Sequence, residues 1–111
     1  MNLTQLPQEV LSYLPQGHEV QHGVWLVLPA DDGSQHSIAS VNSWIRAENW
    51  YPQSLQSVIW FGDDGVGNFF GWNPGKQLAV LWNPEDGDEP MREGNVNELW
   101  QFVLNGYSEV V

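Results

Sequence analysis

Apolar residues along this chain form both helical stripes and short continuous runs, which predict three helices and four strands. Apolar residues three and four positions apart lie on one face of a helix. This spacing predicts helices over residues 7–14, 40–48 and 96–105. Short apolar runs that are rich in aromatic and β-branched residues are typical of strands. Such runs predict strands over residues 24–28, 57–61, 66–72 and 77–82.

The second and third predicted helices each have one apolar stripe that we expect to be buried. In the second helix the stripe consists of Val41, Trp44 and Ile45. In the third helix it consists of Leu99, Phe102 and Val103, with Trp100 beside it. Asn95 and Glu98 have the spacing of a capping box, with Asn in place of Ser or Thr. Gly106 suits the position just after the helix.

The last two predicted strands are joined by Asn73-Pro74-Gly75-Lys76. Proline presets φ at the second position of a turn and glycine accepts a positive φ at the third, so we predict a type II turn. The flanking strands then pair as an antiparallel hairpin. Period-2 alternation places Leu78, Val80 and Trp82 on one face of the sheet and Ala79 and Leu81 on the other.

The order of the elements is helix, strand, helix, three-strand meander and helix, which indicates the α+β class. With 111 residues, the chain is long enough for one domain with its own core. We therefore predict a single domain over residues 1–111, with a mainly antiparallel twisted sheet. About three helices are expected to pack at the side and ends of this sheet.

The charge balance is strongly acidic, with 3 Lys and Arg against 14 Asp and Glu and a formal net charge of −11. This field repels phosphate backbones and anionic lipids, so we expect neither nucleic acid nor a membrane as a direct partner. It accelerates encounter with a basic protein. The alternative is that the acidity serves only solubility.

Several features bear on the cellular compartment. The chain has no cysteine, which fits a reducing environment. Its first residues have neither the basic nor the apolar region of a signal peptide, and no apolar run approaches the length of a membrane span. The cytoplasm is therefore the predicted location.

The seven tryptophans allow two interpretations. Most of them lie in periodic apolar patterns, which favours a tryptophan-rich core. The alternative is a carbohydrate-binding platform formed by a row of exposed rings from Trp50, Trp72 and Trp82. This second interpretation requires those rings to be exposed.

The sequence offers little for catalysis. It has no Gly-x-Ser-x-Gly motif and no cysteine nucleophile. Ser34, His36 and Ser37 follow Asp31 and Asp32, but residues so close in one turn rarely form a catalytic triad. We expect no enzymatic activity, no catalytic residue and no cofactor.

Metal sites are considered at three places and favoured at none. His18, His22 and His36 are possible zinc ligands, although Gly17 and Gly23 argue against a helix that would align the first two. Two acidic stretches offer oxygen ligands for calcium, but neither matches an EF-hand loop. They comprise Asp63, Asp64 and Asn68 in one and Asp86, Asp88 and Glu89 in the other. The favoured interpretation of the first stretch is an Asx-type turn that binds nearby backbone N–H groups.

Residues 61–70 carry a resemblance to a known family. A strand that enters Gly-Asp-Asp-Gly-Val-Gly-Asn and is followed by an aromatic strand resembles the hallmark of the Smi/Knr family, within the SUKH superfamily. Leu6 and Pro7 with the apolar residues after them, residues 80–83 and residues 96–107 are similar to the flanking elements of that family. The chain departs from the family in starting almost at the Leu-Pro segment, where the family usually has an earlier helix. It also has Gln16-Gly17 where Asn-Gly-Gly is common.

The resemblance implies a single α+β domain that binds proteins and catalyses nothing. Bacterial members resemble cytosolic immunity proteins that neutralise a cognate toxin, often a nuclease, by direct binding. Fungal relatives resemble regulators of cell-wall synthesis, so the fold does not determine the partner. A nuclease has a basic surface, which fits the acidity of this chain. We predict a monomer or weak homodimer.

From the acidic turns we predict the partner-binding residues Asp31, Asp32, Asp63, Asp64, Asp86, Asp88 and Glu89. The residues of the hallmark motif predicted to shape the backbone are Gly62, Gly65, Gly67 and Asn68.

Overall fold

The computed structural model describes residues 5–12, 14, 20–22, 25–28, 37–65 and 67–105. The helices are α1 (Gln8–Leu11), α2 (Ile38–Arg46) and α3 (Val96–Leu104), with short 3-10 helices η2 (Gln53–Leu55) and η3 (Pro84–Asp86). The strands are β1 (Val20–His22), β2 (Trp25–Val27), β3 (Ile59–Asp63), β4 (Phe69–Asn73), β5 (Leu78–Trp82) and β6 (Arg92–Gly94).

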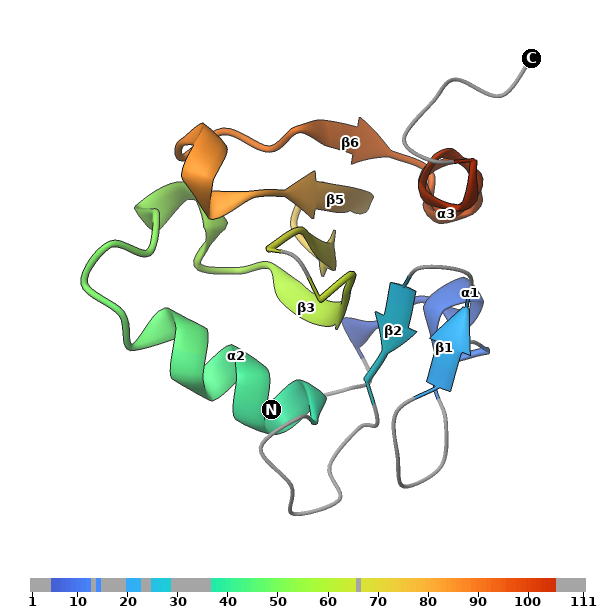
Figure 1. The fold of residues 1–111 in the computed structure, drawn as a ribbon, viewed down its shortest axis with the longest axis horizontal. Coiled ribbons are helices and arrows are strands. Elements are labelled where there is room, and N and C mark those ends of the chain that lie inside the picture. The colour runs from blue at the N-terminus through green and yellow to red at the C-terminus, as the bar shows by residue number, and fades with distance from the viewer. Residues whose placement is uncertain are drawn as a thin grey trace.

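The strands form one antiparallel sheet in the order β1-β2-β3-β4-β5-β6, which is their order along the chain (Figure 1). The chain leaves this meander between β2 and β3 to form α2, and α3 follows β6. The predicted α+β class with a mainly antiparallel sheet is confirmed.

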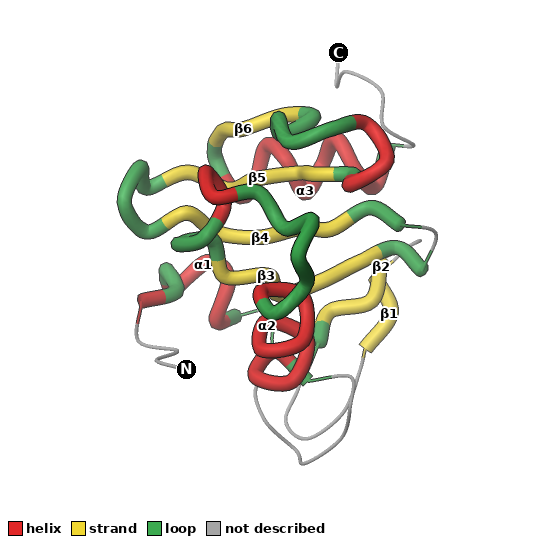
Figure 2. The backbone as a smooth tube through the Cα atoms, turned by 90° about the vertical axis from the view of Figure 1, so that its left-hand side faces the viewer, coloured by secondary structure: helices red, strands yellow, loops and turns green. Residues whose placement is uncertain are grey.

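Helices cover both faces of the sheet. Figure 2 shows α2 in front of the strands and α3 behind them. The end of α2 and the segment after it pack on one face, where Ile45, Tyr51 and Leu55 join Trp60, Val80 and Trp82 in one buried cluster. Val10 of α1 and Val103 of α3 belong to a second, larger cluster.

The alternation predicted for the hairpin is also confirmed. Val80 and Trp82 belong to the first cluster, while Ala79 and Leu81 belong to the second. Adjacent strand residues point to opposite faces, so β5 contributes side chains to both layers of the core.

Several strand boundaries differ from the prediction. The strand predicted at 57–61 is β3, at Ile59–Asp63, and the strand predicted at 66–72 is β4, at Phe69–Asn73. The pairs Leu26↔Asp63 and Phe69↔Asp63 extend β3 to its aspartate, although aspartate is disfavoured in strands. A register shift between Trp60 and Gly62 marks a bulge in β3, so Gly62 of the hallmark motif lies at the point where pairing resumes.

Strands β1 and β6 were not predicted. Each has three residues, too few for alternation to be recognised, and β6 consists of Arg92, Glu93 and Gly94. Its pairing with β5 places it in the sheet. Tertiary pairing overrides local preference here.

The predicted buried stripe of α2 is wrong at Trp44, whose side chain is 55% exposed. The helix starts two residues earlier than predicted, at Ile38, with Ser37 as its N-cap. Its buried residues are Ile38, Val41, Asn42 and Ile45. Asn42 takes the core position because it hydrogen-bonds to β3, and Trp44 lies outside the buried face.

The third helix begins at Val96, and Asn95 caps it as predicted by accepting from the N–H groups of Asn97 and Glu98. Its buried residues are Val96, Leu99, Trp100 and Val103. Trp100 thus replaces Phe102, which is partly buried, in the predicted stripe. Gly106 lies outside the described residues.

The turn between β4 and β5 is not of type II. The positive φ in this turn, 58°, belongs to Gln77 and not to Gly75. The Gln77 N–H donates to the Asn73 carbonyl, and Asn73 Oδ1 accepts from the N–H groups of Gly75 and Lys76. The Asn73 side chain therefore organises a longer turn than the predicted one.

Candidate functional site

Two acidic segments meet at one end of the sheet. The first is the turn between β3 and β4, and the second is the connection from β5 to β6 (Figure 2). Phe69 pairs with Trp82 in the sheet, which brings the residues next to them, Asn68 and Asn83, together. Asn83 Nδ2 donates to Asn68 Oδ1 at 2.8 Å and links the two segments.

The carboxylates of the β3–β4 turn hold its backbone. Asp63 Oδ1 accepts from the Gly65 N–H at 2.9 Å. Asp64 accepts from the Asn68 N–H at 3.1 Å and from Asn68 Nδ2 at 2.6 Å. Gly65 and Gly67 have positive φ values of 79° and 106°, which glycine adopts without strain. The Asx-type turn is confirmed.

The connection from β5 to β6 instead presents its carboxylates to solvent. Asp86, Asp88 and Glu89 are all exposed. The backbone below them is held by Asn83, which caps η3 by accepting from the Glu85 N–H. Trp82 Nε1 donates to the Gly87 carbonyl at 2.9 Å, so a buried ring anchors the loop from beneath.

Two tryptophans are exposed on the same side of the sheet as α2. Trp44 and Trp50 are 55% and 49% exposed, and the Trp50 ring centroid lies 6.4 Å from that of Trp82. The predicted row of exposed rings at Trp50, Trp72 and Trp82 is wrong, because Trp72 and Trp82 are only 6% and 1% exposed. Both belong to strands packed on both faces, so neither can stack on a sugar.

A groove of about 620 Å³ lies between α2 and the β3–β4 turn. Its lining residues are Ser40, Val41, Trp44, Asp63, Gly65, Gly67 and Phe69. The lining is mainly apolar, with one carboxylate from Asp63. On its inner side the Phe69 ring packs near the rings of Trp60 and Trp82. The distance from the Phe69 ring centroid to each of the other two centroids is 6.0 Å.

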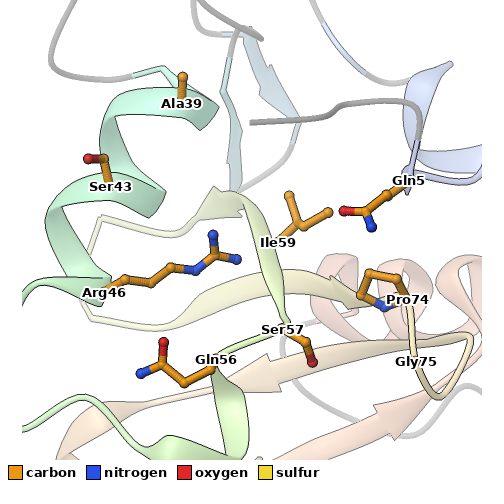
Figure 3. A pocket seen from close by; sticks show the side chains of 9 residues that line it. All are labelled: Gln5, Ala39, Ser43, Arg46, Gln56, Ser57, Ile59, Pro74 and Gly75. Carbon is orange, nitrogen blue, oxygen red and sulfur yellow. The ribbon is translucent and has the colours of Figure 1, made fainter.

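A second cavity, of about 880 Å³, lies between α2, the start of β3 and the β4–β5 turn. Figure 3 shows the Arg46 side chain extending from α2 toward Ile59 on β3. The guanidinium donates to the Val58 carbonyl and so ties the end of α2 to the segment leading into β3. Apart from Arg46, the polar groups that line this cavity are the hydroxyls and amides of Gln5, Ser43, Gln56 and Ser57.

Tyr51 lies beside this contact and has a perturbed pKa. Burial raises the pKa of Tyr51 above its usual value of 10.0, and hydrogen bonding to Trp60 and the nearby Arg46 oppose that rise. The Tyr51 hydroxyl donates to the Leu55 carbonyl at 2.6 Å and accepts from Trp60 Nε1 at 2.8 Å. These bonds make it a structural tyrosine of the core.

Other predicted sites lie wholly or partly outside the described residues. Asp31, Asp32, His18 and His36 are among them, and of His22 only the strand backbone is described. Within the described ranges, no three His, Asp or Glu side chains gather where they could hold a metal ion. In the same part of the chain, no helix is long and apolar enough to cross a membrane.

Sequence reasoning therefore found the acidic turns but missed the groove. The one sequence feature that could have indicated the groove is Trp44. Its position in an apolar stripe led to the prediction that its side chain is buried, whereas it is exposed. The other groove wall comes from a turn that is distant along the chain, and only the folded sheet brings it to α2.

Comparison with known proteins found no matching family model, no similar curated protein and no similar solved structure. The resemblance of residues 61–70 to the Smi/Knr family thus stays a prediction.

Proposed function

We propose that this chain is a non-catalytic protein-binding module that binds a basic protein with the acidic end of its sheet. The observation that carries the proposal is the exposure of Asp86, Asp88 and Glu89 on a backbone held by Asn83 and Trp82. A loop held in this way loses little conformational entropy when it binds. The net charge of −11 adds long-range attraction toward a basic partner.

The neighbouring tryptophans support a protein partner. Trp is among the residues that contribute most to binding energy in protein interfaces. Trp44 and Trp50 expose large ring surfaces on the α2 side of the sheet. An acidic rim beside exposed rings suits a surface rich in Lys and Arg, because such side chains pair with carboxylates and stack on aromatic faces.

The partner that we propose is a protein toxin, such as a nuclease, and the chain would act as its cytoplasmic immunity protein. The resemblance of residues 61–70 to the Smi/Knr family motivates this identity. A nuclease binds phosphates through basic groups, and exposed carboxylates can pair with the same groups. Direct binding to nucleic acid or to a membrane is not part of the proposal.

Co-expression with the product of the adjacent gene tests this function. We expect the adjacent product to inhibit bacterial growth alone and the intact chain to restore growth. The double variant Asp86→Lys and Asp88→Lys should protect poorly, because it reverses charge on the exposed loop. Exposed Glu9 and Glu98 on α1 and α3 provide a matched control, Glu9→Lys and Glu98→Lys, which should still protect.

Two results would refute the proposal. One is an adjacent product that is harmless, or that stays toxic although the intact chain is folded and abundant. The other is equal loss of protection in the loop variant and the control.

A further inference from the structure

We propose that the groove between α2 and the β3–β4 turn receives an arginine side chain of the partner, stacked on Trp44 and paired with Asp63. The proposal rests on the proposed function, because it assumes a basic partner. It specifies one binding site, and the side chain that fills it, on a surface for which the proposed function gives only the charge.

The shape of the groove fits a long side chain. Its volume of about 620 Å³ lies in the range of small-ligand sites. One wall is formed by Ser40, Val41 and Trp44 of α2. The opposite wall includes Gly65 and Gly67, where the absence of a side chain leaves open space around the Cβ position, with no atom within 4 Å.

The chemistry of the groove favours a cation with an apolar stem. The exposed face of Trp44 attracts a cation through the quadrupole of its ring, and Val41 and Phe69 offer apolar contact. Asp63 Oδ1 accepts from the Gly65 N–H, and the two oxygens of a carboxylate together offer about four lone-pair sites. An incoming guanidinium can therefore find both a stacking face and an acceptor.

Arginine fits this combination better than lysine. Its planar guanidinium stacks on rings, is weakly hydrated and can pair with a carboxylate in a fork geometry. One such cation–ring contact occurs within this chain, since Arg92 Cζ lies 4.1 Å from the ring centroid of Phe102. An ammonium group has no plane to stack and is more costly to remove from water.

The test is an NMR titration of the intact, ¹⁵N-labelled chain with a capped triarginine peptide, with the tryptophan indole N–H signals as the readout. Capped trilysine has the same charge and controls for general attraction to an acidic protein. We expect the Trp44 signal to shift more with triarginine than with trilysine, and the Trp50 signal to shift less than the Trp44 signal. A capped trileucine peptide should leave both unchanged.

Substitutions then locate the site. Trp44→Leu should weaken triarginine binding about threefold or more, since it removes the aromatic face but keeps an apolar surface. Asp63→Asn should also weaken binding, while it keeps an oxygen for the Gly65 N–H. Trp50→Leu changes a tryptophan of similar exposure outside the groove and should weaken triarginine binding less than Trp44→Leu does.

Several outcomes would overturn the inference: equal shifts with triarginine and trilysine, a shift with trileucine, or equal effects of Trp44→Leu and Trp50→Leu. The proposed function is tested separately from the arginine site. Suppose that the toxic partner binds the Trp44→Leu variant as tightly as the intact chain but binds the Asp86→Lys and Asp88→Lys variant more weakly. The proposed function is then supported, and the arginine site is refuted. If the intact chain binds no such partner, the function falls.

Discussion

Asn42 is a fully buried polar residue. Its side-chain amide makes the hydrogen bonds to β3 that the backbone of a neighbouring strand would otherwise make. Its Nδ2 donates to the carbonyls of Ile38 and Trp60, both at 2.7 Å, and its Oδ1 accepts from the Trp60 N–H at 2.8 Å. Strand β2 pairs with β3 only at Gly62 and Asp63, so Trp60 lies beyond that ladder. The amide of Asn42 therefore satisfies both backbone groups of one strand residue, as a neighbouring strand would.

Replacement of Asn42 by Ala should destabilise the fold strongly. It leaves the buried N–H and carbonyl of Trp60 without this partner, and each such group costs about 1–3 kcal/mol. Ser43→Ala, on the exposed side of the same helix, is the control and should change the free energy of unfolding little. Chemical denaturation measures both, and equal effects of the two variants would contradict the assigned role.

Tyr51 predicts how stability depends on alkaline pH. Its pKa in the folded state is raised above 10.0 by burial, so the unfolded chain releases this proton first as the pH rises. The contribution of Tyr51 is therefore fully present below pH 10 and is lost as the pH rises from 10.0 through the folded pKa.

Tyr51→Phe should be less stable at neutral pH, because Trp60 Nε1 and the Leu55 carbonyl lose a partner. Its stability should also fall less steeply above pH 10 than that of the intact chain. Urea denaturation at a series of pH values gives both quantities. Parallel curves for the two proteins would show that Tyr51 is not a titrating core group.

At the scale of elements, β3 and β4 pack as closely as their side chains allow at Gly71. A Cβ atom added to Gly71 would lie 2.5 Å from Trp60 Cε3 and 2.8 Å from Val58 Cγ1. Both side chains are fully buried and have no room to move away. Glycine at this position thus permits the Trp60 ring to lie across the neighbouring strand.

Gly71→Ala should lower the free energy of unfolding by about 1–3 kcal/mol or more, the usual cost of overpacking a core. Gly75→Ala tests the same chemical change in the exposed β4–β5 turn, where the nearest atom to the added Cβ is 3.4 Å away. We expect the second variant to be close to the intact chain in thermal or urea denaturation. A neutral effect of Gly71→Ala would mean that Trp60 does not pack as described.

The elements that the sequence predicted are those with a complete local signal. Helix α3 has a cap residue in Asn95, and β5 is a continuous run of five apolar residues. Strand β6 has no such signal, because its place depends on pairing with β5. Trp44 was misplaced because an apolar residue next to a buried stripe looks like part of it, while the buried Asn42 looks like a surface residue.

The candidate site also has one part that the sequence could predict and one part that it could not. Exposed carboxylates at Asp86, Asp88 and Glu89 follow from an acidic, proline-bounded loop, which a sequence reveals. The meeting of this loop with the β3–β4 turn depends on strand register, and the groove depends on where α2 packs. Neither is a local property, so neither could be predicted.

At the scale of the whole molecule, the charge of −11 acts on any partner before contact. The Debye length is about 8 Å at physiological ionic strength, so only charges near the contact surface remain effective there. The acidic loop should therefore govern the association rate, while the exposed tryptophans should govern the lifetime of the complex.

The most direct test of this account is the association rate constant with the toxic product of the adjacent gene, measured by stopped flow across a series of ionic strengths. For the intact chain the rate should fall about tenfold or more from low to physiological salt. The variant Asp86→Asn and Asp88→Asn should bind more slowly at low salt and depend less on salt. The control Glu9→Gln and Glu98→Gln has the same net charge and should behave like the intact chain. Equal slowing of the two variants, or a rate that does not change with salt, would contradict binding through the acidic end of the sheet.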